Sequence, residues 1–312
     1  MTISQIHVLF HVPEGFEEIA TLDIKESLLP FEGLDPLSTI YISEAKTGRV
    51  HLFSKIHQEI EIKQWWDFLS NIALVCVYHM TLITTTTTIP IQDVYHDNKK
   101  IMDEQENQEE KEEDNVLGQY IQSKVKHTNW QAYLNHIQQD NNNEDTSSSA
   151  KTTFRATFYK DQLTHSMKTQ DISGWIGYAY SELYPLWKVN LKKYDYNIVG
   201  IWGKSKDQAL LAHCLCKDET IDSSLKEGKE EEETRPILLY LGIEIPMPDP
   251  KYRNRVHLGR TSLNPPIASC LVRLADPQPG QIIFDMCCGT GTIPIEGASK
   301  YPNTLWVGGE DS

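Results

Sequence analysis

The sequence has little of what marks membrane, secreted or disulfide-stapled proteins. No run of 18 or more apolar residues occurs, so no membrane-spanning helix is expected. Residues 1–10 lack a basic start followed by a long apolar stretch, and so do not read as a secretion signal. The six cysteines are irregularly spaced and Cys287 and Cys288 are adjacent. This usage favours reduced thiols and a cytoplasmic location, with a nuclear location as the alternative.

Residue pairs at metal-ligand spacing are also scarce. Cys214 and Cys216 could form half of a metal site. No second cysteine pair or histidine pair stands at a matching distance, so we expect no metal.

Positive charge is in deficit, with a formal net charge of −15. Nearly all of this acidity lies in residues 97–115, 138–150 and 217–234, which are poor in aliphatic residues and rich in Glu, Asn, Ser and Lys. Such segments bury too little apolar surface to offset the entropy of ordering, so they predict disordered inserts. The rest of the chain is near neutral, and nucleic-acid binding is therefore not excluded.

The remaining segments predict two α+β units. The first, residues 1–95, should contain strands at 5–12 and 49–53 and helices at 16–29 and 59–69, while helix and strand stay open for 72–84. An acidic insert follows at 96–115. The second unit, residues 116–246, should contain strands at 152–160, 189–195, 197–203 and 237–245 and a helix at 173–184, with inserts near 138–150 and 217–234.

The pattern changes again in residues 247–312. A helix should begin near Pro265 or Pro266, because proline is favourable in the first turn. An apolar strand ending at Asp285, a glycine loop, a helix and a second strand ending near Glu310 then follow. This order predicts the opening of a doubly wound α/β domain.

The glycine loop predicts a nucleoside cofactor. Gly289 and Gly291 let a ligand approach the backbone closely. A dinucleotide fingerprint needs a small residue where Pro294 stands, and a Walker A loop needs a Gly-Lys-Ser/Thr that is absent. Glu310 follows Gly291 at roughly the 20-residue distance of ribose-binding acids. Taken alone, two glycines also fit an ordinary tight turn.

Four stretches resemble the THUMP-domain RNA methylases. Residues 285–296, DMCCGTGTIPIE, resemble the first methyltransferase motif of that family, and residues 260–266, RTSLNPP, resemble the start of its pre-motif helix. Residues 12–26, VPEGFEEIATLDIKE, resemble its N-terminal element, and residues 150–246 resemble a THUMP module with acidic insertions. Within the family the chain is most similar to the eukaryotic guanosine-N2 tRNA methyltransferases.

The resemblance implies a ferredoxin-like N-terminal α+β domain, a THUMP RNA-binding domain, and the first part of a Rossmann-like class I methyltransferase domain. It implies S-adenosyl-L-methionine as cofactor, tRNA as substrate, and a small zinc-binding activator subunit as partner. The residues that it places around the cofactor are Asp285, Cys287, Gly289, Thr290, Gly291, Thr292 and Glu310.

The catalytic motif of that family, Asp/Asn-Pro-Pro-aromatic or Asp-Leu-Pro-aromatic, is not found in this sequence and is expected beyond Ser312. The tetrapeptide 264–267, Asn-Pro-Pro-Ile, is similar, but its isoleucine cannot stack on an extruded base. We interpret it as a helix start. The chain alone is therefore expected to be inactive and prone to aggregate.

Basic residues in two places are candidates for RNA contact. One group, interleaved with Trp187, Tyr194, Tyr196 and Trp202, lies in the second unit, and the other lines the link into the third. Lysines and arginines neutralise phosphates and exposed aromatics stack on bases. The pattern alone equally fits buried aromatics with solvated lysines, and a non-catalytic RNA-binding protein with a vestigial cofactor loop is the alternative function. The candidates are Lys188, Lys192, Lys193, Lys204, Arg253, Arg255 and Arg260.

Overall fold

The computed structural model describes residues 5–58, 60–89, 106–137, 152–160, 167–205, 207–215, 237–255, 259 and 262–310. The chain divides into two compact units of mixed α/β structure. We call Thr81–Glu244 the central unit, and Thr2–Met80 together with Ile245–Ser312 the split unit. Neither unit, as far as it is described, has a helix that is long and apolar enough to cross a membrane.

The N-terminal part of the split unit is a small sheet with helices. Its strands are β1 (Gln5–His11), β2 (Thr39–Glu44) and β3 (Arg49–Lys55), in the order β2-β3-β1 with antiparallel pairing. Its helices are α1 (Glu17–Leu28) and α2 (Ile60–Asn71). The predicted strands at 5–12 and 49–53 and both predicted helices are confirmed. Strand β2 was not foreseen, because its half-exposed residues show no clean alternation.

One buried carboxylate fixes where α1 begins. Glu17 accepts hydrogen bonds from the main-chain N–H groups of Gly15, Thr47 and Gly48 at 3.1, 3.0 and 2.8 Å. The side chain therefore ties the first turn of α1 to the turn between β2 and β3. Ala20, Ile24 and Leu28, spaced one turn apart, form the buried stripe of the helix.

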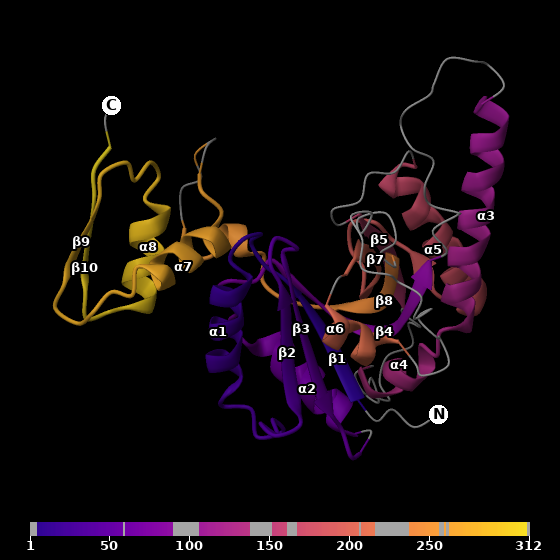
Figure 1. Ribbon diagram of the computed structural model, residues 1–312, viewed down its shortest axis with the longest axis horizontal. Helices are drawn as coiled ribbons and strands as arrows, with labels where there is room; N and C mark the ends of the chain where they lie inside the picture. Colours follow the sequence, from indigo (N-terminus) through magenta and orange to yellow (C-terminus); the bar gives the residue numbers. More distant parts are fainter. Residues whose placement is uncertain are drawn as a thin grey trace, which may run out of the picture. The chain divides into compact units, whose positions relative to one another are not determined.

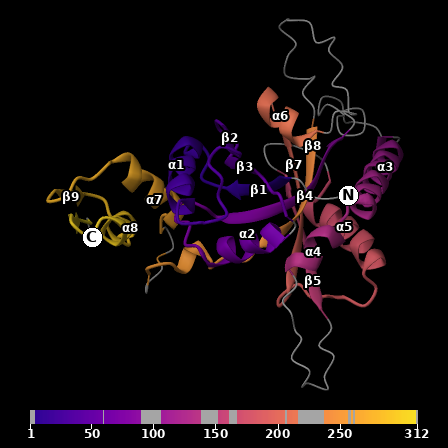
Figure 2. The same ribbon diagram turned by 90° about the horizontal axis from the view of Figure 1, so that it is seen from below.

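The central unit is built of strands and helices (Figures 1 and 2). Its strand order is β4-β8-β7-β5-β6, in which β5 pairs in parallel with β7 and β6, and β7 pairs antiparallel with β8. Helix α3 packs against α5, and Gly118 allows the contact, since an added Cβ would lie 2.7 Å from the Trp175 ring. The elements are β4 (His79–Ile89), α3 (Glu106–His127), α4 (Gln131–Ile137), β5 (Thr153–Lys160), α5 (Thr169–Leu183), β6 (Lys188–Val189), β7 (Tyr196–Lys204), α6 (Gln208–Cys214) and β8 (Ile237–Ile245).

The strands predicted at 152–160, 197–203 and 237–245 and the helix predicted at 173–184 are confirmed. The open segment 72–84 resolves into a strand from His79, in keeping with its run of β-branched threonines. The strand predicted at 189–195 is wrong beyond Val189. There Asn190 Oδ1 accepts from the main-chain N–H groups of Lys192 and Lys193, both at 3.1 Å, and this side-chain turn replaces strand pairing.

The acidic insert predicted at 96–115 needs one correction. Residues 106–115 form the first part of α3 rather than a disordered stretch. Glu, Gln and Lys have high helix propensity, so an acidic run without apolar residues can still extend a helix whose later residues are packed. Residues 96–105, 138–150 and 217–234 lie outside the described residues.

The C-terminal part of the split unit is a β-α-β unit preceded by a helix (Figure 1). It contains a short 3-10 turn (Pro250–Tyr252), α7 (Pro265–Leu274), β9 (Ile282–Asp285), α8 (Thr292–Lys300) and β10 (Leu305–Gly308). Strands β9 and β10 pair in parallel, with Ile282 opposite Leu305 and Asp285 opposite Gly308. The predicted strand, glycine loop, helix and second strand are confirmed. So is the helix start, since Pro265 is the first residue of α7 and Asn264 caps it.

Candidate functional site

The loop between β9 and α8 depends on its two glycines. Gly289 has φ +52°, and Gly291, which caps α8, has φ +77°. Both values lie in the left-handed region that residues with a Cβ rarely adopt. An added Cβ at Gly289 would meet nothing within 4 Å, so conformation rather than crowding requires glycine there.

Main-chain hydrogen bonds fix the loop against the end of β10. The Gly291 N–H donates to Cys288 O at 2.7 Å, and the Cys288 N–H donates to Gly309 O at 2.9 Å. The Gly309 N–H donates in turn to Asp285 O at 2.8 Å. Gly308 permits this close approach, since a Cβ there would lie 2.7 Å from Cys288 Sγ. The ends of the two parallel strands therefore form one platform.

Two carboxylates lie at this platform. Glu310 Oε2 accepts from the Gly289 N–H at 2.7 Å, and Asp285 Oδ1 accepts from the Cys287 N–H at 3.2 Å. Glu310, Cys287, Gly289 and Thr290 are exposed, and Asp285 is half-buried. Carboxylate oxygens and main-chain groups at the carboxyl ends of parallel strands suit the hydroxyl and amino groups of a nucleoside. These residues fit S-adenosylmethionine, whose ribose hydroxyls would pair with a free oxygen of Glu310.

A neighbouring segment contributes a residue that sequence reasoning missed. Ser262 Oγ lies 2.9 Å from Thr290 Oγ1 and accepts from the Gly259 N–H at 2.8 Å. Residues 259 and 262–263 thus lie against the glycine loop. Nothing in the residue pattern indicates this contact, because it depends on how the chain before α7 folds back.

Thr292 differs from the other six predicted cofactor residues. Its side chain is buried, and its hydroxyl donates to Leu263 O at 3.4 Å and accepts from Arg255 Nη1 at 3.2 Å. The side chain therefore holds protein groups together at the start of α8. The other six, Asp285, Cys287, Gly289, Thr290, Gly291 and Glu310, gather at the loop and the end of β10.

The arginines proposed for RNA contact make bonds within the protein. Arg253 Nη2 donates to Glu296 Oε2 at 2.8 Å, to Ser269 Oγ at 3.0 Å and to Val75 O at 3.1 Å. Arg255 Nη2 donates to Leu263 O at 2.9 Å. These bonds indicate a structural role, and RNA contact by the two arginines stays an untested prediction. Arg260 lies outside the described residues.

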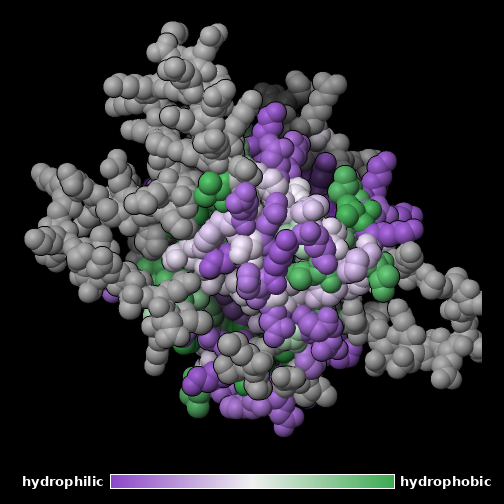
Figure 3. Space-filling model, turned by 90° about the vertical axis from the view of Figure 1, so that its right-hand side faces the viewer, coloured by the Kyte–Doolittle hydropathy of each residue, from purple (hydrophilic) through white to green (hydrophobic). Residues whose placement is uncertain are grey.

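The candidate lysines are in the central unit, and three of them surround one turn. Lys188, Lys192 and Lys193 are exposed around Asn190, and Lys204 is half-buried at the end of β7. Figure 3 shows a face of the molecule on which hydrophilic residues predominate and hydrophobic ones are scattered.

The aromatics interleaved with these lysines are mostly packed. Trp202 is fully buried, and Trp187 stacks on Tyr196 with ring centroids 5.3 Å apart. The Arg155 guanidinium lies 4.2 Å from the centroid of the Tyr194 ring. The interpretation of the aromatics as core therefore holds for Trp202.

No group of three or more His, Cys, Asp or Glu in the described part of the chain could hold a metal ion. Cys214 is half-buried, and Cys216 lies outside the described residues.

Comparisons with known proteins point to the same segment. Residues 250–306 match the family model described as RMKL-like, methyltransferase domain. Over 60 residues the chain is 45% identical to the bovine (Bos taurus) tRNA (guanine(6)-N(2))-methyltransferase THUMP3, covering 19% of this chain and 12% of that protein. Over 74 residues it is 31% identical to the human (Homo sapiens) U6 snRNA (guanine-N(2))-methyltransferase THUMPD2, covering 24% of this chain and 15% of that protein.

A solved structure is similar to nearly the whole chain. The crystal structure of TrmN from Thermus thermophilus matches 98% of this chain and 65% of that chain, with a TM-score of 0.54 at 16% identity, which shows a shared fold. The family match confirms the prediction of a methyltransferase-type domain in the C-terminal segment. S-adenosylmethionine is the cofactor that this domain type uses, as predicted.

Proposed function

We propose that this chain supplies the methyl-donor site and the RNA-binding unit of a methyltransferase that modifies N2 of guanine in tRNA. Its relatives support the reaction: one is named as acting on tRNA and the other on U6 snRNA, both at guanine N2. The platform at the ends of β9 and β10 supports the donor.

The bond between Glu310 and Gly289 carries the proposal. A left-handed glycine exposes its N–H at the loop, and a carboxylate from the next strand lies 2.7 Å away. Because Glu310 uses Oε2 for the loop, Oε1 would be left to accept from other donors such as ribose hydroxyls. The same side chain would then order the loop and hold the sugar.

When bound, S-adenosylmethionine would supply an electrophilic methyl group to the guanine amine nitrogen; the methyl–sulfur bond would break, leaving S-adenosylhomocysteine, and the methylated amine would release one proton to water. The residues of this chain contribute by holding the donor still, so that the nitrogen meets the methyl group in line, and most of the rate gain comes from that positioning. The 264–267 tetrapeptide starts α7, and Pro265 and Pro266 are buried, so we assign it no role toward the base.

The exposed lysines Lys188, Lys192 and Lys193 support RNA binding by the central unit. Their charges lie around one turn, where they can neutralise neighbouring phosphates. We propose the central unit as a THUMP-type module, the N-terminal part of the split unit as ferredoxin-like, and a small zinc-binding subunit as partner of the complete enzyme in the cytoplasm.

The donor site is tested by titrating S-adenosylhomocysteine into the chain and measuring heat. We expect binding that weakens about tenfold in Glu310→Gln, since an amide holds a hydroxyl less well than a carboxylate. A control variant, Glu182→Gln, changes a carboxylate that pairs with Lys126 in the central unit at 2.7 Å and should bind as the unmodified chain does.

The reaction is tested on the full-length protein with tritium-labelled donor, total tRNA and U6 snRNA, followed by nucleoside analysis. N2-methylguanosine in tRNA is expected. RNA binding without any affinity for S-adenosylhomocysteine would instead identify a non-catalytic RNA-binding protein, and label in another nucleoside or in protein would refute the guanine-N2 assignment.

A further inference from the structure

Helix α8 carries three polar residues on one face. Thr292, Glu296 and Lys300 stand four residues apart, and this spacing places them along one stripe of the helix. Thr292 and Glu296 are buried. A buried carboxylate destabilises the fold unless it is paired, so Glu296 in particular needs a bonding partner.

Each member of the stripe bonds to a residue before α8 in the chain. Thr292 accepts from Arg255, and Glu296 accepts from Arg253. Lys300 donates to Asp23 on α1, whose side chain is 3% exposed. The helix is therefore held at its first turn, its middle and its last residue.

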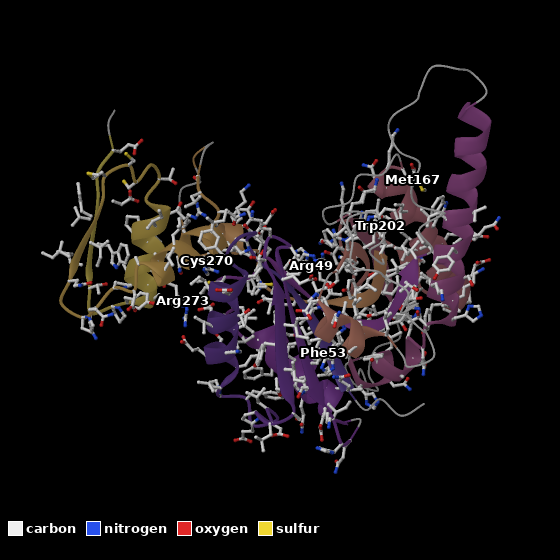
Figure 4. All side chains as sticks on the ribbon, viewed as in Figure 1. Arg49, Phe53, Met167, Trp202, Cys270 and Arg273 are labelled. Carbon is white, nitrogen blue, oxygen red and sulfur yellow. The ribbon has the colours of Figure 1, made fainter. Side chains whose placement is uncertain are left out.

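The partners reach back into the N-terminal part of the split unit. Arg253 also donates to Val75 O, in the segment between α2 and β4, and to Ser269 on α7. Asp23 lies 3.6 Å from Arg273, the last basic residue of α7 (Figure 4). The stripe thus joins residues before 80 to the helix whose N-terminus forms the glycine loop.

We infer that Arg253, Arg255 and Asp23 are positioning residues for α8. Through Arg253 and Asp23 the N-terminal part of the split unit sets the place of the helix and so of the methyl-donor loop, and Arg255 holds its first turn against residue 263. This inference rests on the proposed donor site. It gives the two arginines a task other than RNA contact, and it makes Asp23 part of the framework that holds the donor loop in place.

The geometry favours positioning over simple adhesion. If the interface only held the two parts together, ion pairs to α7 would serve equally well, and one exists: Glu26 on α1 accepts from Arg273 Nη1 at 2.7 Å. The stripe is additional to that pair, and all three of its members lie on α8. The stripe holds α8 by contacts at its first turn, its middle and its last residue, and contacts spread along the helix in this way oppose both sliding along its axis and rotation about it.

Glu296→Gln is the test variant and Glu26→Gln the matched control. Both replace a carboxylate that binds an arginine within the split unit, but Glu296 lies on α8 and pairs with Arg253, whereas Glu26 lies on α1 and pairs with Arg273 on α7. Hydrogen–deuterium exchange of the loop amides is the main readout. Cys288, Gly289 and Gly291 N–H groups are hydrogen-bonded in the structure, so their exchange reports opening of the loop.

We expect exchange at residues 288–291 to rise about tenfold in Glu296→Gln and to stay unchanged in Glu26→Gln. Arg255→Met removes the partner of Thr292 and serves as a second stripe variant in case Glu296→Gln does not fold. It should raise the exchange of the same amides. Equal exchange in the stripe variants and the control would overturn the inference.

Titration with S-adenosylhomocysteine separates this inference from the proposed function. If the unmodified chain binds, the stripe variants should bind about tenfold more weakly and Glu26→Gln should not. If the unmodified chain does not bind, the proposed function fails, while the exchange data still decide whether the stripe positions the loop.

Discussion

Gly291 and Gly280 both have left-handed backbones, with φ +77° and +83°, but only Gly291 belongs to the donor loop. An added Cβ would have room at both, since the nearest atom at Gly291 is Ile295 Cδ1 at 3.7 Å. Alanine should therefore cost each site about 1–2 kcal/mol of backbone strain. We predict that Gly291→Ala weakens S-adenosylhomocysteine binding about tenfold and that Gly280→Ala does not. Calorimetry with both variants checks this, and equal affinities would contradict it.

Buried histidines make the stability of the split unit depend on pH. His7 Nε2 lies 3.0 Å from His51 Nδ1, and His11 stacks on His79. Burial, and then the neighbouring His7, Arg49 and His11, hold the pKa of His51 well below its usual value. Burial and His11 lower the pKa of His79 to about 2. The folded state therefore needs both rings neutral.

The free energy of unfolding should therefore reach its full value above about pH 6.5 and decrease as the pH falls below it. In that range the histidines of the unfolded chain bind protons, whereas the buried rings of the folded chain do not. Each of the two rings should lower the free energy of unfolding by up to about 1.4 kcal/mol for each pH unit below that value. Thermal unfolding between pH 7.5 and 5 checks this. His79→Gln should flatten the dependence, whereas His127→Gln, at an exposed position, should leave it unchanged.

At the scale of elements, β9 and β10 present one apolar face to solvent. Ile282 and Phe284 on β9 are 70% and 58% exposed, and they stand opposite Leu305 and Val307 on β10. The opposite face is covered by α8, where Gly297 lies against the Trp306 ring. A contiguous apolar face of this kind favours association.

We predict that Phe284→Ser lowers self-association of the chain, measured by analytical ultracentrifugation across a concentration series. Leu37→Ser is the control, since Leu37 is 97% exposed outside the sheets. If both variants, or neither of them, show reduced self-association, the apolar face of β9 and β10 does not cause it.

At the scale of the whole molecule, the proposed function assigns donor binding to the split unit and RNA binding to the central unit. Replacing Lys188, Lys192 and Lys193 by glutamine should weaken tRNA binding and reduce its salt dependence by about one unit of slope per lost phosphate contact. Affinity for S-adenosylhomocysteine should stay unchanged. Filter binding at several salt concentrations measures the first and calorimetry the second. Lys63→Gln, which removes a paired exposed charge from α2, is the control.

Local chemistry let the sequence predict most elements of both units. Proline at a helix start, left-handed glycines after an apolar strand and alternating apolar residues act within a few positions, so β9, α7, α8 and β10 could be placed in advance. Strand β2 could not, because its half-exposed residues show no regular apolar alternation, and the acidic start of α3 could not, because its sequence carries no apolar pattern.

By itself, the sequence determined the donor loop, since the residues that shape it are contiguous and their backbone demands are intrinsic to glycine. Only the tertiary structure decided the tasks of Arg253, Arg255 and Ser262. An arginine before a helix fits an RNA phosphate or a buried carboxylate equally well. The choice depends on a partner such as Glu296, 43 residues away, which only folding brings within 2.8 Å.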